Sequence, residues 1–297
     1  MTRSNVPLLL LLALPIFAQS DPVSRSWNQP VAPFRITGNL YYVGASDITS
    51  YLITTPRGHI LLDGGFVETA PMILANIRTL GFDPKDVRIL LSSHAHYDHA
   101  GGLAELKRVT GAKFHSSLGD LPQHARGGLD DPQFGNKYPY PPITADRIVR
   151  DGTRITLGGT TLVAHITPGH TPGCTTWTAR IGKHDVVFVG SPSVPSEYRL
   201  IGNPRYPNAV EDYRAQFRTL KRLDCDIFLA SHGAFFGLAE MLAKKKRWAD
   251  GDEYKAFVSA AEKRFEDRIS APKSTMMRRR SQQPPPNGTT MEAPRGE

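Results

Sequence analysis

Side chains that can bind metal ions are concentrated in residues 92–102, which read Ser-Ser-His-Ala-His-Tyr-Asp-His-Ala-Gly-Gly. In an extended segment successive side chains point to opposite sides, so His94, His96 and Asp98 can project together while His99 points elsewhere. One short stretch can therefore serve two adjacent metal ions. Imidazole and carboxylate ligands together suit zinc, although iron or manganese can occupy the same ligands.

Two more histidines lie in settings that resemble this cluster. His170 occupies a turn rich in Pro and Gly, residues 167–173, that follows a strand-like run. His232 follows the apolar run Ile227–Ala230. Each is at a predicted strand end, as the first cluster is, and we predict that both belong to the same site. The other histidines have no such setting and are interpreted as structural: His59, His115, His124, His165 and His184.

The elements that must position these residues are read from apolar periodicity and turn signals. Strands are predicted at 40–43, 50–54, 59–62, 86–91, 113–115, 154–157, 161–166, 175–181, 185–189 and 227–230. Helices are predicted at 69–80, from near Ala100 to Val109, and at 209–223, 238–248 and 253–267. Gly101 and Gly102 leave room for backbone to approach the ions closely. The long segment 127–143 is a candidate lid.

A faint internal repeat indicates how the elements are arranged. Residues 49–65 and 175–191 align without a gap, each reading strand, glycine-containing turn, strand, then Gly64 or Gly190. This pattern predicts an α/β fold of two similar halves, packed as a helix–sheet–sheet–helix sandwich with the site in the seam where the strands end. Coincidence between two short segments is the alternative.

The ends of the chain differ from its middle. Residues 1–20 combine Arg3, an apolar run at 6–17 and the small-residue site Ala18-Gln19-Ser20, which predicts a secretory signal peptide and a periplasmic or secreted protein. The run is too short to span a bilayer, and no other segment is apolar enough to anchor the chain in a membrane. A domain is predicted at 21–270, followed by a disordered basic and Pro-rich tail at 271–297.

Composition excludes other function classes. The net charge is +8, of which +1 comes from Arg3 and +3 from residues 273–297, so the domain carries only +4. Without basic and aromatic residues interleaved, this mild excess does not indicate nucleic-acid binding. The apolar content of 40 % supports a substantial core, and two cysteines are too few for a disulfide-stapled scaffold.

The order of the three histidine motifs, His-x-His-x-Asp-His, Gly-His-Thr-Pro-Gly and Ser-His-Gly, resembles the metallo-β-lactamase superfamily over about residues 35–268. The resemblance implies a four-layer αβ/βα sandwich, with two mixed sheets face to face and helices outside. It also implies a structural or ligand-supporting role for Asp63. By the family pattern, one zinc is bound by His94, His96 and His170, and a second by Asp98, His99 and His232.

Within the superfamily, residues 28–30, 58–65 and 202–207 resemble the subclass B3 β-lactamases. Glyoxalase II and the superfamily's lactonases usually carry an aspartate that bridges both metals, at the end of the strand after the third histidine. Here that strand ends in Ser191, and the second-site cysteine of another β-lactamase subclass is also missing. By resemblance, Ser191 and Ser193 are then left as water or substrate contacts, and Tyr198 can reach the substrate carbonyl.

The net charge of the loaded metal site also favours a β-lactam substrate. Two Zn²⁺, the Asp98 carboxylate and one bridging hydroxide sum to +2, because the five histidines bind as neutral ligands. A bridging aspartate would lower that to +1. The more positive site suits a carboxylate beside a reactive carbonyl, as in a β-lactam. Hydroxide held between ions about 3.5 to 4 Å apart and oriented by Asp98 would attack the lactam carbonyl without an acyl-enzyme.

We therefore expect a monomeric zinc β-lactamase that inactivates small-molecule antibiotics. A lactone, thioester or other ester hydrolase of the same superfamily is the alternative, and a non-catalytic binding protein on the same scaffold is a third. Subclass B3 relatives often bridge a cysteine at the Cys225 position to one on the last helix, where this chain has Tyr254. We expect Cys174 and Cys225 to be free thiols.

Overall fold

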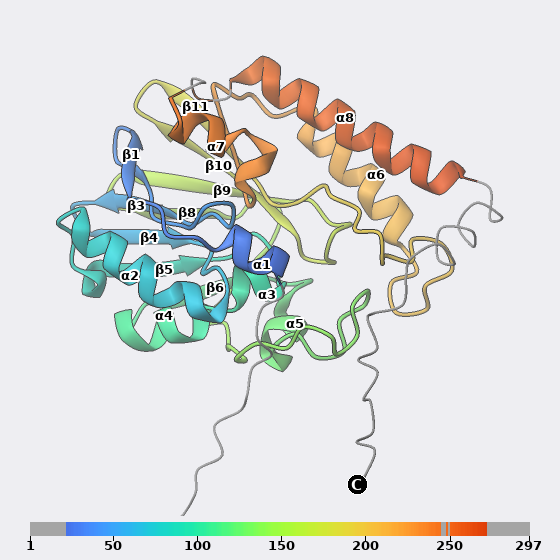
Figure 1. Ribbon diagram of the computed structural model, residues 1–297, viewed down its shortest axis with the longest axis horizontal. Coiled ribbons are helices and arrows are strands. Elements are labelled where there is room, and N and C mark those ends of the chain that lie inside the picture. Colours follow the sequence, from blue (N-terminus) through green and yellow to red (C-terminus); the bar gives the residue numbers. More distant parts are fainter. Residues whose placement is uncertain (1–21, 245–247, 249, 272–297) are drawn as a thin grey trace, which may run out of the picture.

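Two β-sheets form the centre of the protein, in a computed structural model that describes residues 22–244, 248 and 250–271 (Figure 1). One sheet has seven strands in the order β1-β2-β3-β4-β5-β6-β7, and the other has five in the order β12-β11-β10-β9-β8. Both sheets are mixed, since β4 to β7 run parallel, β11 and β12 run parallel, and the remaining neighbours are antiparallel.

The strands of the first sheet are β1 (Phe34–Thr37), β2 (Leu40–Tyr42), β3 (Tyr51–Thr55), β4 (Gly58–Leu62), β5 (Val87–Leu91), β6 (Lys113–Ser117) and β7 (Arg147–Val149). Those of the second are β8 (Arg154–Leu157), β9 (Thr160–Ile166), β10 (Thr175–Ile181), β11 (His184–Val189) and β12 (Ile227–Ala230). Every residue of β4 is buried, as expected for a central strand covered on both faces.

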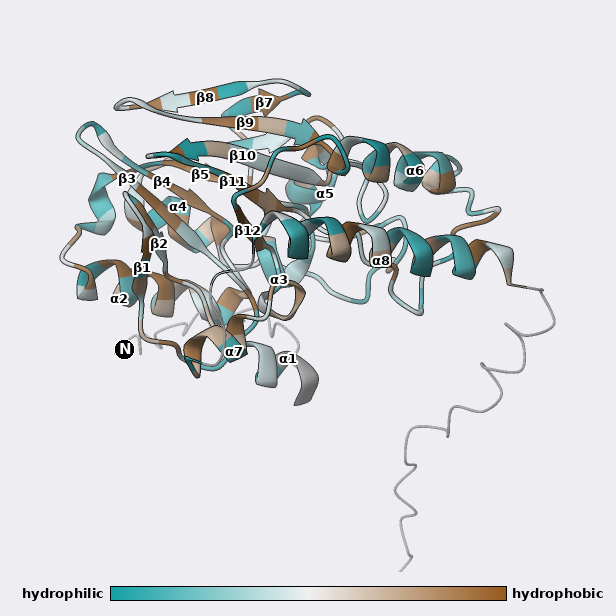
Figure 2. Ribbon diagram, turned by 90° about the horizontal axis from the view of Figure 1, so that it is seen from above, coloured by the Kyte–Doolittle hydropathy of each residue, from teal (hydrophilic) through white to brown (hydrophobic). Residues whose placement is uncertain are grey.

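The helices are α1 (Pro22–Trp27), α2 (Ala70–Thr79), α3 (Tyr97–Ala100), α4 (Leu103–Thr110), α5 (Leu121–Arg126), α6 (Ala209–Leu220), α7 (Leu238–Leu242) and α8 (Gly251–Ser270). Helices α2 and α4 cover the outer face of the seven-stranded sheet, while α6 and α8 cover the five-stranded sheet (Figures 1 and 2). The predicted four-layer αβ/βα sandwich is confirmed.

Two apolar interfaces hold the layers together. Tyr51 of β3 and Phe188 of β11 meet between the sheets, with ring centroids 5.1 Å apart. Ile73 of α2 and Leu103 of α4 are fully buried in a second cluster on the outer face of the seven-stranded sheet. Hydrophobic burial on both faces of that sheet explains why its inner strands read as continuous apolar runs.

The internal repeat matches the topology. β3 and β4 form an antiparallel pair, and β4 then pairs in parallel with β5. β10 and β11 repeat this arrangement in the other sheet, where β11 pairs in parallel with β12. Residues 49–65 and 175–191 therefore occupy equivalent places in the two sheets.

Several predicted boundaries need correction. The helix predicted from near Ala100 begins at Leu103 as α4, and residues 97–100, expected to be extended up to Asp98, form the short helix α3. The helix predicted at 238–248 ends at Leu242. Among the α-helices and strands, α1, β1, α5 and β7 were not predicted. Gly101 and Gly102 do give close approach, but to backbone: a Cβ on Gly102 would lie 2.2 Å from the carbonyl oxygen of Gly64. These glycines let the turn after β4 pack against the start of α4.

The structure also bears on the cysteines and the chain ends. Cys174 and Cys225 are both free, as predicted. The predicted signal peptide, residues 1–20, and the predicted tail beyond Ala271 lie outside the described residues. Among the described helices, none has both the length and the apolar character needed to cross a membrane.

Candidate metal centre

The ligand candidates lie where strands of both sheets end. The segment with His94 and His96 leaves β5, and Asp98 and His99 lie on the short helix α3 that follows. The turn with His170 leaves β9, and His232 comes two residues after β12. All six side chains are brought together at this seam, although they come from three distant parts of the sequence. The six ligand candidates are His94, His96, Asp98, His99, His170 and His232.

The first triad consists of His94, His96 and His170. One nitrogen from each ring lies within 4.8 Å of the others, and His96 Nδ1 is 3.1 Å from His170 Nε2. All three residues are at most 6 % exposed. This is a compact set of three imidazoles at one point, shielded from solvent.

The second triad consists of Asp98, His99 and His232. His99 Nε2 lies 3.2 Å from His232 Nε2, and the Asp98 Oδ2 oxygen lies 3.3 Å from the former and 3.5 Å from the latter. His94 also has a nitrogen within 4.8 Å of ligand atoms of Asp98 and His99. The two triads are therefore adjacent.

These residues fit zinc. Ligands about 2.0 to 2.1 Å from a tetrahedral zinc ion lie about 3.3 Å from one another, which is the spacing within the second triad. His94 Nε2 is buried and has no hydrogen-bond partner among the described residues. A buried nitrogen without a partner is costly unless something binds its lone pair, and a metal ion at the first triad would do so.

Burial lowers the pKa of His94 and of His170 well below the usual histidine value, so both rings are neutral, as metal ligands must be. Burial also opposes ionisation of His232, but Asp47 and Asp98 outweigh it and raise the pKa of this ring to about 9, so a metal ion must displace a proton there. Burial opposes ionisation of Asp98, but His99 and His232 more than offset it and hold the pKa of this carboxyl well below its usual range. The second triad thus has a charged carboxylate at neutral pH.

The far nitrogens of the ligand rings are oriented by neighbours. His170 Nδ1 lies 3.0 Å from the carbonyl oxygen of Ser193, and His232 Nδ1 lies 2.8 Å from Asp47 Oδ2. Asp47 is anchored in turn, since its Oδ1 accepts a hydrogen bond of 2.6 Å from the Ala234 amide. Such contacts fix which ring nitrogen faces the metal. Sequence analysis missed Asp47, because it lies 185 residues from its partner.

Replacing Asp47 is expected to weaken the second triad selectively. In Asp47→Asn the side chain keeps its size but loses the charge that faces His232. We expect zinc affinity at the second triad to fall by about 10- to 100-fold, with little change at the first. Competition with a chromophoric chelator measures both binding steps. Equal loss at both triads would indicate general disruption instead.

A buried carboxylate holds the two ligand-bearing segments together. Asp120 Oδ2 accepts hydrogen bonds of 2.9 Å from the Ala95 amide, beside His94, and from Thr171 Oγ1, beside His170. Its Oδ1 accepts from the Gly173 amide at 2.8 Å. Burial raises the pKa of Asp120 to about 6 even though these bonds favour the carboxylate. Asp120 is 1 % exposed and was not predicted as a site residue.

Asp63, at the end of β4, supports the same segment from the other side. Its Oδ1 accepts a hydrogen bond of 2.6 Å from the Ser93 amide, and its Oδ2 is 4.0 Å from His99 Nδ1. The backbone of Asp63 has a φ of 65°, which is uncommon for a residue other than glycine. These contacts agree with the ligand-supporting role that the resemblance implies.

The three predicted substrate contacts differ in their settings. Ser193 is partly exposed, and its Oγ lies 3.1 Å from Ser191 Oγ and 3.4 Å from His170 Nδ1. Ser191 is buried. Tyr198 is also buried, and its hydroxyl donates a hydrogen bond of 2.9 Å to the carbonyl oxygen of His170. Ser193 is therefore the most accessible of the three.

The five histidines interpreted as structural have other surroundings. His59 and His115 lie within strands β4 and β6, His124 packs edge-on against Phe114, and His165 Nε2 is 2.9 Å from Thr178 Oγ1. His184 begins β11, at the opposite end of the strand from Ser191.

The fold and the two triads define an α/β sandwich with a candidate two-metal site at the edge where its sheets meet. The family model of the metallo-beta-lactamase superfamily matches residues 43–232. The chain belongs to this superfamily. The solved structure of the FEZ-1 metallo-beta-lactamase from Legionella gormanii is 41 % identical, with a TM-score of 0.79, over 82 % of this chain and 97 % of that one. BJP-1, a subclass B3 metallo-beta-lactamase of Bradyrhizobium japonicum, is 35 % identical, with a TM-score of 0.77, over 85 % and 97 %.

Curated relatives include enzymes of a different substrate class. The N-acyl homoserine lactonase AttM of Azorhizobium caulinodans is 29 % identical over 161 residues, which is 45 % of this chain and 59 % of the relative. The chain thus spans somewhat over half the length of that curated relative. Together the family, the fold and the histidine cluster support a metallo-hydrolase.

Proposed function

We propose that this protein is a zinc-dependent β-lactamase that hydrolyses the amide bond of β-lactam antibiotics and binds two zinc ions per chain. The observation that carries the proposal is the composition of the second triad. Asp98 is its only carboxylate, His99 and His232 contribute imidazoles, which bind metal in the neutral form, and the segment after β11 carries Ser191 in place of a bridging aspartate. Such a centre keeps a high positive charge when loaded, which favours an anionic substrate.

The likeness to solved structures supports the same substrate class. FEZ-1 and BJP-1 are 41 % and 35 % identical to this chain and match it over 97 % of their own lengths.

The residues of the centre have distinct roles in this proposal. When bound, zinc lowers the pKa of water to about 7, so that hydroxide is available at neutral pH, and it polarises a carbonyl group. Asp98 would accept a hydrogen bond from the attacking hydroxide and hold it facing the lactam carbonyl. The hydrogen of that hydroxide stays on the adduct after attack, and Asp98 could pass it to the ring nitrogen as the amide bond breaks, which leaves a carboxylate and an amine.

Substrate orientation falls to the segment after β11. The Ser193 hydroxyl is partly exposed beside His170, so it can donate a hydrogen bond to the substrate carboxylate. Ser191 keeps the Ser193 hydroxyl in place through the 3.1 Å contact between their oxygens. Tyr198 reaches the substrate carbonyl only if its hydroxyl exchanges the bond to His170 for one to substrate.

Residue 191 provides the test. Ser191→Asp adds a carboxylate at the centre, which lowers the charge available to a substrate carboxylate. We expect kcat/KM for β-lactams to fall by about tenfold to 150-fold, the effect of losing a charged interaction worth about 1.5 to 3 kcal/mol. Turnover of a neutral lactone or thioester should fall less. Steady-state assays with a carbapenem and a homoserine lactone measure both.

Two controls accompany this substitution. Ser196→Asp makes the same chemical change at an exposed position of the same segment and should leave both rates unchanged. Zinc content of each variant must be measured, because loss of metal would mimic loss of substrate binding. The proposal is wrong if the zinc-loaded wild-type protein hydrolyses lactones or thioesters well and leaves every β-lactam intact, or if Ser191→Asp depresses all substrates equally.

A further inference from the structure

Both ring nitrogens of His96 have polar neighbours. Nδ1 faces the first triad, 3.1 Å from His170 Nε2, while Nε2 points away from it. A neutral imidazole carries its single hydrogen on one nitrogen and a lone pair on the other. If Nδ1 binds a metal ion, Nε2 must carry the hydrogen and needs an acceptor.

Two acceptors lie near His96 Nε2. Asp131 Oδ2 is 3.5 Å away, and Tyr198 Oη is 3.4 Å away. Tyr198 already donates its hydroxyl proton to the carbonyl oxygen of His170, so only its oxygen lone pairs face His96. Asp131 is 3 % exposed and presents a charged oxygen, which makes it the stronger partner.

We propose that Asp131 is a positioning residue for the metal ligand His96, and that it couples zinc binding at the first triad to the order of the turn at residues 131–135. The proposal concerns metal binding and is independent of which substrate the protein hydrolyses.

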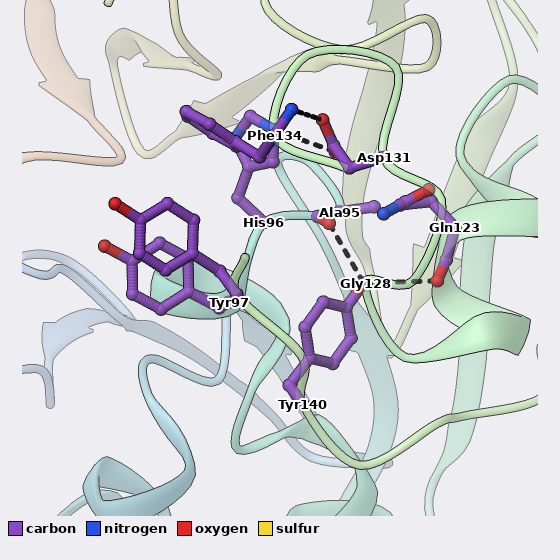
Figure 3. A pocket seen from close by; sticks show the side chains of 9 residues that line it. Ala95, His96, Tyr97, Gln123, Gly128, Asp131, Phe134 and Tyr140 are labelled. Atoms are coloured by element: carbon purple, nitrogen blue, oxygen red, sulfur yellow. Dashed lines mark hydrogen bonds and ion pairs between the residues drawn. The ribbon is translucent and has the colours of Figure 1, made fainter. Parts of the chain in front are cut away.

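The Asp131 side chain holds that turn together. Its Oδ1 accepts hydrogen bonds of 2.7 Å from the amides of both Gln133 and Phe134, and its backbone exchanges hydrogen bonds of 2.9 and 3.0 Å with Gly135. The Phe134 ring lies over His96, with centroids 5.0 Å apart (Figure 3). One carboxylate therefore serves the turn with one oxygen and the metal ligand with the other.

The turn is also tied to the segment after β11. The Arg199 amide donates to Gln133 Oε1 at 3.0 Å, and Asn203 Nδ2 donates to the Pro132 carbonyl oxygen at 2.9 Å. Whatever orders the turn thus also restrains the segment that carries Tyr198. Because coupling free energies are reciprocal, zinc that favours the Asp131 contact must stabilise the turn, and an ordered turn must strengthen zinc binding.

Asp131→Asn separates the two uses of the carboxylate. The amide oxygen can still accept from Gln133 and Phe134, but the atom that then faces His96 Nε2 is an NH₂ group, a donor opposite a donor. We expect zinc affinity at the first triad to fall by about 10- to 100-fold and affinity at the second to change by less than about threefold. Chelator competition measures both steps, with His170→Ala and His232→Ala to assign each step to its triad.

Hydrogen exchange supplies the second readout. In the wild-type protein, adding zinc should slow amide exchange in a peptide that contains Gln133 and Phe134. In Asp131→Asn the same addition should slow it much less. Asp130→Asn is the matched control, because Asp130 is the exposed neighbour in the same loop and should leave affinity and exchange as in the wild type.

Three further measurements make the result decisive. Thermal unfolding of the metal-free variants shows whether folding is intact. If Asp131→Asn fails to fold, Asp131→Ser replaces it, since a serine hydroxyl can still cap the turn while removing the charge. Tyr198→Phe removes the other acceptor and should cost less zinc affinity than Asp131→Asn. Asp47→Asn should show the opposite selectivity, weakening the second triad.

The coupling is supported by selective loss at the first triad together with the loss of zinc-dependent protection. It is overturned if the folded Asp131 variants bind zinc at the first triad as tightly as the wild type, or lose both triads equally. It is also overturned if Tyr198→Phe alone causes the loss, or if the wild-type first triad binds no zinc. A protein that meets the zinc criteria but hydrolyses no β-lactam would contradict only the proposed substrate.

Discussion

Removal of zinc is expected to abolish β-lactam hydrolysis. Water has a pKa of about 15.7, and zinc lowers it to about 7, so without the metal almost no hydroxide is present at neutral pH. We expect the metal-free protein to retain less than about one-thousandth of the loaded rate, and two equivalents of zinc to restore it. Initial rates of carbapenem hydrolysis before and after chelation, with elemental analysis of each sample, measure this.

The outcome also discriminates between nucleophiles. Ser193 Oγ lies 3.4 Å from His170 Nδ1, and once the metal is gone the ring hydrogen can move to Nε2, which leaves Nδ1 free to activate the serine. Activity that survives complete removal of metal would contradict the zinc mechanism and point to this pair. In that case Ser193→Ala would abolish the residual rate, whereas the zinc mechanism expects Ser193→Ala to affect mainly substrate binding.

Replacing Asp120 is expected to have the largest effect on stability. Asp120→Ala leaves the buried donors of Ala95, Thr171 and Gly173 without their acceptor. Each unsatisfied buried donor costs about 1 to 3 kcal/mol, so the free energy of unfolding should fall by about 3 kcal/mol or more. Denaturant unfolding of the metal-free protein measures the change without a contribution from zinc.

A surface aspartate supplies the matched control. Asp267→Ala on α8 removes an exposed ion pair with Lys263 and should change the free energy of unfolding by no more than about 1 kcal/mol. Zinc affinity should also fall in Asp120→Ala, because the segments with His94 and His170 lose their common anchor. If the two variants unfold at the same denaturant concentration, Asp120 does not hold these segments together.

Much of the fold could be read from the sequence because its central strands are covered on both faces. β4 is buried throughout and ends in the apolar run 60–62, and strands β9, β10 and β11 were predicted within a residue of their true bounds. Edge strands β1 and β7 were missed, since each has only three or four residues and one pairing partner. Their formation depends on a neighbouring strand more than on their own residues.

The metal ligands were predicted for a related reason. His94, His96, Asp98 and His99 lie within one short segment, and His170 and His232 each follow a predicted strand, so local sequence marks all six. The residues that orient and anchor these ligands cannot be recognised from their local sequence. Asp47, Asp120 and Asp131 sit in loops where an aspartate is ordinary, and their partners are distant in the chain.

The sequence by itself therefore determined the order of the elements, the superfamily and the six candidate ligands, because each depends on residue type and short-range spacing. The division into two triads was implied by the family resemblance, but only the tertiary structure decided how close the triads lie and which carboxylates orient His96 and His232. Those contacts depend on where the strand ends of two sheets meet and on the direction of each side chain. Distances of about 3 Å between residues remote in sequence arise only once the sheets have packed face to face.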